Sequence, residues 1–273
     1  MLIFRDTNVA SSLQTDTHCL TAQVDEAGIS YAVIDGQGIC RLLQRHSFPP
    51  VTSYNDWAQA LATTFRDDEW LTKTYRASRW SFPSNKATLI PERLFDAEQL
   101  HTCLRYAAPL DELDEIHYRR LPAYEAVCLF AIPNPPANEI LKYQPETQFI
   151  HPQEQLLSLL ATPDDDNRIA LYVTPTLVGM AAFVENKWAL SNMYPVKAFT
   201  DVLYNLLMAL KALRLTQDNF TLFYTGQLGE ADEELLRRYF PHLRCLYDSN
   251  AGVRMGRTHA VGYHLLLTLA QCE

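Results

Sequence analysis

Short apolar runs separated by turn signals open the chain, at residues 19–24, 29–34 and 38–48. Gly stands close to Asp in the joints at 25–28 and 35–38, which is typical of tight hairpins. The pattern predicts three antiparallel strands, which the prolines at 49–50 bring to an end. Residues 1–16 are polar apart from an early apolar run, and we expect a surface tail or an added edge piece there.

A helix is expected next, because Ser53 is suited to cap one and Trp57, Leu61 and Phe65 recur every four residues. The remainder of the first half alternates between strand-like and helix-like segments. Strands are predicted at residues 74–82, 87–90, 116–120, 126–132 and 149–151, and helices after Asp96, at 138–143 and at 152–161.

The segment 162–167 is polar, charged and proline-bearing, and it lies between two strongly apolar elements. It predicts a domain boundary, with a first lobe at 17–163 and a second at 167–273. The second half is predicted to contain strands at 169–173, 178–185, 187–194, 220–224 and 242–247, and helices at 198–215, 230–240 and 260–272. A polar, glycine-bearing loop is expected at 248–256, where Arg244, Arg254 and Arg257 could hold an anion or simply be solvated.

Both halves show the same order of elements: three strands, a long amphipathic helix, and then an apolar strand. Self-similarity of this kind is an architectural signal even without residue identity between the halves. It predicts an α/β protein of two ribonuclease H-like lobes, which is the architecture of actin, Hsp70 and hexokinase.

Composition and charge narrow the function classes. Hydrophobic residues make up 48% and charged residues 20% of the 273 residues, as in ordinary globular proteins. The formal net charge of −9 gives no electrostatic footprint for nucleic acid or anionic lipid, and no apolar run is long enough for a membrane span. A metal-dependent nuclease would need several converging carboxylates, of which only Asp25 suits the role. Without a signal peptide, and with six cysteines read as free thiols, the chain is expected in the cytoplasm.

Three short segments carry a resemblance to a known family: 88–95 (TLIPERLF), 121–125 (LPAYE) and 223–226 (FYTG). Together with the paired strand triplets, they are similar to a family of uncharacterised bacterial proteins with an actin-like ATPase fold. The resemblance covers the chain from about residue 17 to its end. It implies a fold and a domain of unknown function, not a reaction.

Actin-like ATPases resemble one another in three loops that hold phosphate, metal and adenosine. In the first loop this chain has Asp25 and Gly28, one residue too far apart for the family pattern. In the second the acid is missing, and Pro175 removes a backbone donor from the turn. In the third, Gly226 is in place and its second glycine, Gly229, is displaced.

The resemblance therefore implies Asp25, Gly28 and Gly226 as the residues that would contact a nucleotide, if one binds. For Asp25 and Gly28 the alternative is an ordinary hairpin turn. No catalytic residue, metal ligand or obligatory cofactor is predicted, although ATP with magnesium stays open.

Two functions are compatible with the sequence. The first is a non-catalytic pseudo-ATPase that binds a protein partner, with no nucleic-acid or membrane partner. The alternative is a divergent nucleotide-binding ATPase or small-molecule kinase of the actin-like superfamily. The first follows from the altered phosphate loops, and the second from the surviving Asp25, Gly28 and Gly226.

Overall fold

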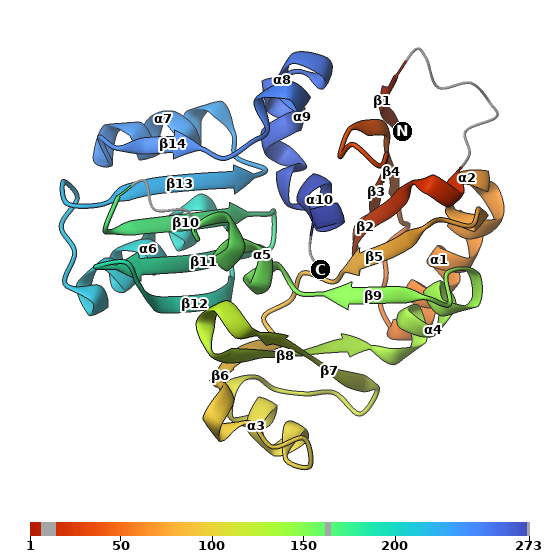
Figure 1. Ribbon diagram of the computed structural model, residues 1–273, viewed down its shortest axis with the longest axis horizontal. Coiled ribbons are helices and arrows are strands. Elements are labelled where there is room, and N and C mark those ends of the chain that lie inside the picture. Colours follow the sequence, from red (N-terminus) through yellow and green to blue (C-terminus); the bar gives the residue numbers. More distant parts are fainter. Residues whose placement is uncertain (7–14, 162–164, 272–273) are drawn as a thin grey trace.

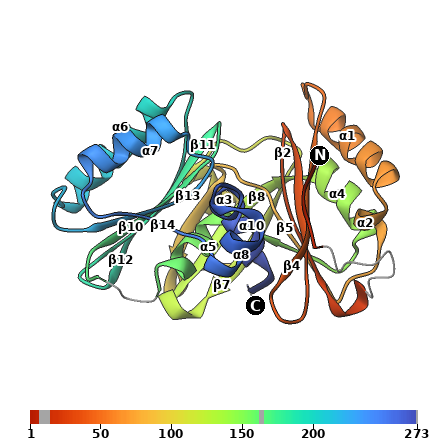
Figure 2. The ribbon, with the colours of Figure 1, turned by 90° about the horizontal axis from the view of Figure 1, so that it is seen from above.

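The computed structural model describes residues 1–6, 15–161 and 165–271. Two β-sheets face each other across a central group of helices, and further helices cover the outer side of each sheet (Figures 1 and 2). A third, smaller sheet lies at one end of this assembly (Figure 1).

The sheet of lobe I has the strand order β1-β4-β3-β2-β5-β9. Its strands are β1 (Leu2–Arg5), β2 (Cys19–Asp25), β3 (Gly28–Ile34), β4 (Cys40–Ser47), β5 (Ala77–Ser81) and β9 (Thr147–Ile150). The β2–β3 and β3–β4 pairs are antiparallel, whereas β2–β5 and β5–β9 are parallel. The start of the chain adds β1 to the open edge of β4, so it is an edge piece.

The sheet of lobe II repeats this topology, with the strand order β12-β11-β10-β13-β14. Its strands are β10 (Arg168–Val173), β11 (Leu177–Val184), β12 (Lys187–Pro195), β13 (Thr221–Gly226) and β14 (Leu243–Cys245). The first three are again antiparallel neighbours, and β13 and β14 again join in parallel. The duplicated ribonuclease H-like architecture and the antiparallel strand triplets predicted from the sequence are confirmed.

Outer helices bury one face of each sheet. In lobe I these are α1 (Tyr54–Asp67), α2 (Glu69–Thr72) and α4 (Asn134–Tyr143), and in lobe II α6 (Phe199–Leu213) and α7 (Glu230–Tyr239). The Ser53 side chain accepts a hydrogen bond from the Asp56 N–H and starts α1, whose Trp57 and Phe65 enter the core as predicted. Helix α6 likewise packs Val202 and Leu206 against the strand triplet of lobe II, as expected.

The inner faces of the two sheets are joined by helices that cross between lobes. Helix α5 (Pro152–Leu159) follows the last strand of lobe I and packs on β10, β11 and β12 of lobe II. In return, α10 (His264–Thr268), which comes after the last strand of lobe II, packs on β2 and β3 of lobe I as well as on β13. Each lobe therefore contributes a helix to the other's sheet, so their separation would expose core on both sides.

The third sheet is inserted between β5 and α4 and has the order β6-β8-β7. It consists of β6 (Ala87–Pro91), β7 (Asp114–Leu121) and β8 (Ala126–Pro133), with α3 (Leu100–Ala107) on one face. The other face packs into the lobe I core through Cys128 and Phe130. The apolar pattern predicted these strands but did not show that they form a sheet of their own.

The C-terminal region differs most from expectation. Residues 248–256 were expected to be a loop, and instead they contain α8 (Ser249–Met255), whose Ala251 and Met255 are buried against lobe I. Burial of this apolar pair outweighs the polar composition of the segment. The single helix expected at 260–272 is divided into α9 (Arg257–Gly262), α10 and a short 3₁₀ turn.

Two other expectations concern Asp96 and the linker between the lobes. Asp96 does not cap α3 but accepts a hydrogen bond from Glu98 N–H one turn earlier. The proposed linker at 162–167 lies partly outside the described residues, and the lobe limits 17–163 and 167–273 stay a prediction.

Among the cysteines, Cys19, Cys40 and Cys128 are buried and free, Cys103 and Cys245 are half-buried, and Cys272 lies outside the described residues.

Candidate functional site

The first predicted phosphate loop is the β2–β3 hairpin, which contains Asp25 and Gly28. The Asp25 carboxylate accepts hydrogen bonds from the N–H groups of Ala27, at 2.8 Å, and Gly28. Burial raises the pKa of this carboxyl above its usual range, although Arg45 and these hydrogen bonds oppose the shift. Asp25 therefore occupies the backbone donors of its own turn, which an incoming phosphate would need.

Gly28 is explained by the packing of strands. It pairs with Asp25 on one side and with Ser47 of β4 on the other. A Cβ atom at this position would lie 2.1 Å from the carbonyl oxygen of His46, closer than any real contact. The sheet thus requires glycine here, whether or not a ligand binds.

The second predicted loop joins β10 to β11 and contains Thr174 and Pro175. The Thr174 hydroxyl accepts hydrogen bonds from the N–H groups of Leu177, at 2.9 Å, and Thr176, at 3.4 Å. Thr174 N–H donates to the Leu177 carbonyl at 2.9 Å. With a proline and three engaged N–H groups, this turn is closed by its own side chain.

The third predicted loop begins at Gly226, at the end of β13. Gly226 has φ +95°, and a Cβ atom there would lie 2.2 Å from the Val173 carbonyl oxygen. The next residue, Gln227, donates its N–H to that carbonyl at 2.7 Å. Gly226 therefore allows β13 to end in close contact with β10.

Between the first and third loops lies Tyr172, which is only 3% exposed. Its hydroxyl hydrogen-bonds the Gln23 side chain of lobe I, and its ring lies 3.1 Å from the position that a Cβ of Gly226 would take. Burial raises the pKa of Tyr172, with the nearby Asp25 charge acting in the same direction. The fold therefore brings Asp25, Gly28 and Gly226 to the same interlobe region, but Tyr172 lies among them.

A second bridge crosses the same region. Arg45 of β4 donates to the Ser30 hydroxyl at 3.0 Å, and both residues hydrogen-bond Tyr263, which lies between α9 and α10. We call Gln23, Asp25, Ser30, Arg45, Tyr172 and Tyr263 the interlobe cluster. Sequence reasoning singled out only Asp25 of these six, because the other five come from separate strands and helices and form no motif.

A cavity of about 550 Å³ opens beside Gly226, between β13, α7 and α9. On its wall, Glu233 accepts hydrogen bonds from Arg237 at 2.6 Å and Arg257 at 2.9 Å, and also bonds Tyr224. These donors hold the pKa of Glu233 below its usual value, despite partial burial. Of the arginines considered for an anion site or a solvated connection, Arg257 pairs with Glu233, and Arg254 lies 3.8 Å from Asp6.

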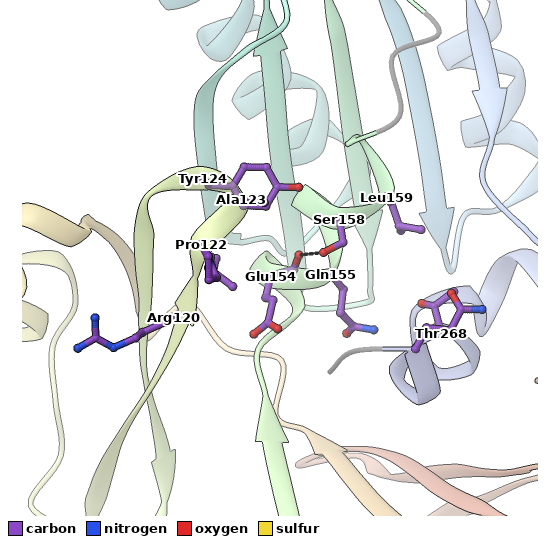
Figure 3. Close-up of a pocket in the computed structure, with 11 residues that line it drawn as sticks. Arg120, Pro122, Ala123, Tyr124, Glu154, Gln155, Ser158, Leu159 and Thr268 are labelled. Atoms are coloured by element: carbon purple, nitrogen blue, oxygen red, sulfur yellow. Dashed lines mark hydrogen bonds between the residues drawn. The ribbon is translucent and has the colours of Figure 1, made fainter. Parts of the chain in front are cut away.

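A second cavity, of about 350 Å³, lies where the inserted sheet meets α5 and the end of the chain (Figure 3). Beside it, Arg119 of β7 donates through Nε to both carboxylate oxygens of Glu154, at 2.8 and 3.1 Å. Tyr124 donates to the Leu157 carbonyl at 2.9 Å. These contacts fix the inserted sheet to α5, so this cavity adjoins a structural joint.

In the described part of the chain, residues 1–6, 15–161 and 165–271, no group of three or more His, Cys, Asp and Glu residues is arranged to hold a metal ion. No helix in those same ranges has the length and apolar character required to cross a bilayer.

Residues 7–243 match the model of a family described as "Protein of unknown function (DUF3822)". Because the match covers most of the sequence, the chain belongs to this family. A search of curated proteins gives no match.

Solved structures give the class of fold. A protein from Bacteroides thetaiotaomicron, with an actin-like ATPase fold and unknown function, aligns with 97% of this chain and 100% of its own, at TM-score 0.82 and 17% identity. A chain of the PilM–PilN type IV pilus biogenesis complex aligns with 94% of this chain and 98% of its own, at TM-score 0.62 and 12% identity. At these identities the likeness concerns the fold alone. The protein therefore has an actin-like ATPase fold, as the sequence resemblance implied.

Proposed function

We propose that this protein is a non-catalytic member of the actin-like superfamily that binds a protein partner. The observation that carries the proposal is the state of the phosphate loops. Asp25 occupies the donors of the first turn, Thr174 occupies those of the second, and Gln227 N–H is bonded to Val173. A phosphate would have to displace these bonds before it gained any of its own.

The interlobe cluster adds a second argument. Phosphoryl transfer depends on positioning and on the stabilisation of charge by metal ions and donors. In this region Tyr172 is hydrogen-bonded to Gln23, and Tyr263 is hydrogen-bonded to both Arg45 and Ser30. Arg45 also donates to Ser30. These contacts favour a fixed arrangement of the lobes over one that opens and closes around a ligand.

A relative in fold supports the binding half of the proposal. The PilM–PilN complex contains a chain of this fold in an assembly with a protein partner. The rigid two-lobed frame is thus suited to presenting surfaces to other proteins. The identity of a partner for this chain does not follow from that likeness.

Calorimetric titration of the full chain with Mg-ATP and Mg-ADP tests the proposal. We expect no heat of binding at submillimolar ligand, while an actin-like ATPase in the same buffer gives a normal isotherm. Submillimolar binding would overturn the non-catalytic interpretation. A second experiment tests the binding of a protein partner. A protein that co-purifies stoichiometrically with the tagged chain should remain bound after EDTA has chelated magnesium and any nucleotide has been washed away.

The alternative is a divergent nucleotide-binding protein, and the cavity of about 550 Å³ beside Gly226 favours it. Asp25→Asn and Arg257→Gln test this alternative on the two sides of the region. Binding that both variants weaken would assign the ligand there, and the exposed Asp67→Asn is a matched control. Gly226 is unsuited to such a test, because a side chain would strike Val173 and disturb the fold.

A further inference from the structure

Helix α6 lies on the outer side of its sheet (Figure 2), and several of its apolar side chains are exposed. Tyr204 is 62% exposed, Leu207 50% and Met208 48%, and their spacing of three and four places them on one face. Lys211 continues this face by one turn. We call these four residues the α6 patch. The opposite face is fully used, since Val202, Leu206, Ala209 and Leu210 are buried in the lobe II core.

The equivalent helix of lobe I provides an internal comparison. Helix α1 occupies the same place after its strand triplet and packs in the same way, but its exposed positions are Asn55, Asp56, Gln59, Arg66 and Asp67. A surface helix normally has this polar outer face. The fold therefore does not require the apolar outer face of α6, and an adjacent group of large apolar side chains of this kind is typical of a contact surface.

Charge indicates which partner fits this surface. The chain has a formal net charge of −9, so two copies repel each other unless their contact is locally balanced. Around α6 the balance is different: Lys197, Lys211 and Arg214 are positive, and Asp201 and Asp218 are negative. These charges nearly balance, so a second copy that approaches α6 meets little local repulsion.

The order of these charges also fixes an orientation. Near the start of α6 lies Asp201, whose Oδ2 also accepts the Lys197 and Ala198 N–H groups, and near its end lie Lys211 and Arg214. Two α6 helices that run antiparallel bring the acidic end of each beside the basic end of the other. Parallel helices would instead bring Lys211 beside Lys211 of the second copy.

We propose that this protein forms a two-fold symmetric dimer in which α6 packs antiparallel against α6 of a second copy. The axis passes near Leu207 and Met208, so Leu207 packs on Met208 of the second copy and Tyr204 lies opposite Lys211 of the second copy. An isologous contact of this kind uses the same patch twice. The proposal concerns a different surface from the interlobe region and does not depend on whether a nucleotide binds.

Sedimentation equilibrium over a wide range of concentrations tests the proposal. One helix face is small beside the ~800 Å² per partner of a standard interface, so we expect a weak dimer that dissociates on dilution. The mass should approach twice the 31.2 kDa of one chain at high concentration. Leu207→Glu with Met208→Glu should keep the chain monomeric, whereas Tyr106→Glu, at a 90% exposed position on α3, should not. A wild type that stays monomeric, or a double variant that still dimerises, would overturn the proposal.

Cross-linking tests the orientation separately. Positions 204 and 211 are about 10 Å apart along the helix. In the antiparallel pair, position 204 of one copy therefore lies opposite position 211 of the second copy, and not opposite the second copy's own position 204. Tyr204→Cys mixed with Lys211→Cys should therefore give a disulfide-linked dimer on mild oxidation, and each variant alone should give no more than wild type. Efficient linkage of either variant alone would contradict the antiparallel arrangement.

Discussion

The hydroxyl of Tyr172 in lobe II hydrogen-bonds the side chain of Gln23 in lobe I, across the region where actin-like ATPases hold phosphate. Tyr172 is at the end of β10, and Gln23 is on the equivalent strand, β2, of the other lobe. The first strands of the two antiparallel triplets, β2 and β10, are thus connected directly by side chains.

Tyr172→Phe should lower the free energy of unfolding by about 0.5–1.5 kcal/mol, the usual net value of one intramolecular hydrogen bond. The ring and its packing stay, so the change isolates the hydroxyl. Chemical denaturation measures the effect, and Tyr118→Phe at a 45% exposed position should have an effect within about 0.5 kcal/mol. An unchanged stability in Tyr172→Phe would show that this contact does not help to join the lobes.

Pro175→Gly should reduce stability by about 0.4–1 kcal/mol, because proline restricts the unfolded chain at a turn that suits it. The Thr174 hydroxyl closes this turn, so the added N–H and flexibility should create no nucleotide response. The measurement is a melting curve with and without Mg-ATP, beside wild type. A ligand-induced shift in wild type that the variant alters would favour the nucleotide-binding alternative.

Gly28→Ala should destabilise the protein by more than about 1 kcal/mol, because its Cβ cannot be placed 2.1 Å from the His46 carbonyl oxygen without a backbone shift. Gly36→Ala is the matched control: it lies in the next hairpin, and its nearest neighbour is 3.9 Å away. Urea denaturation of the two variants compares them. Equal stabilities would mean that the sheet tolerates a side chain at position 28, and that its glycine has another cause.

The fold was largely predictable because it depends on local patterns that occur twice. Turn signals separated the strands of each triplet, and Ser53 marked the start of α1. The glycines at 252 and 256 favoured a loop, but the segment contains a helix, because burial of Ala251 and Met255 decides its structure. Contacts between distant elements, such as the inserted third sheet, leave no local pattern in a single sequence.

The candidate site was predictable only in part, for the same reason. Asp25, Gly28 and Gly226 could be found because they lie in loops with a recognisable spacing. The reason for each glycine lies in a residue distant in sequence, since His46 lies against Gly28 and Val173 against Gly226. Sequence spacing can thus locate the altered loops, whereas the groups that occupy their donors become visible only in three dimensions.

Acid should destabilise the protein through His151, which is fully buried. Its Nδ1 accepts the Gln153 N–H at the start of α5, and its Nε2 lies 3.1 Å from the Ser84 carbonyl, so the neutral ring fits this place. Burial lowers the pKa of His151 to about 4, from 6.5 for an ordinary histidine. Since only the unfolded chain binds the proton in this window, stability is intact above about pH 6.5 and falls toward pH 4.

The expected slope for one such histidine is about 1.4 kcal/mol per pH unit. His264 is also buried with a pKa of about 4, and it should contribute in the same direction. His151→Asn keeps an acceptor at the helix start and should flatten the slope, whereas the exposed His101→Asn should not. Unfolding curves across this pH range measure both, and identical slopes in wild type and His151→Asn would contradict the assignment.

Arg119 and Glu154 provide a test of how the inserted sheet is held. Their ion pair is nearly buried, with 19% and 8% of the side chains exposed. Arg119→Met leaves the Glu154 carboxylate without its cation and should cost about 3–5 kcal/mol. Burial already raises the pKa of Glu154, so in this variant the loss should be largest near neutral pH and smaller in acid, where the carboxyl takes up a proton.

The neighbouring residue, Arg120, supplies the control, because it pairs with Glu92 at an exposed site. Arg120→Met should therefore cost no more than about 1 kcal/mol. Replacing both partners, as Arg119→Met with Glu154→Leu, removes the unpaired charge and should recover most of the stability lost in Arg119→Met. Chemical denaturation of the three variants measures these differences. If the double variant is no more stable than Arg119→Met, the loss arises from packing around Arg119 rather than from an unpaired carboxylate.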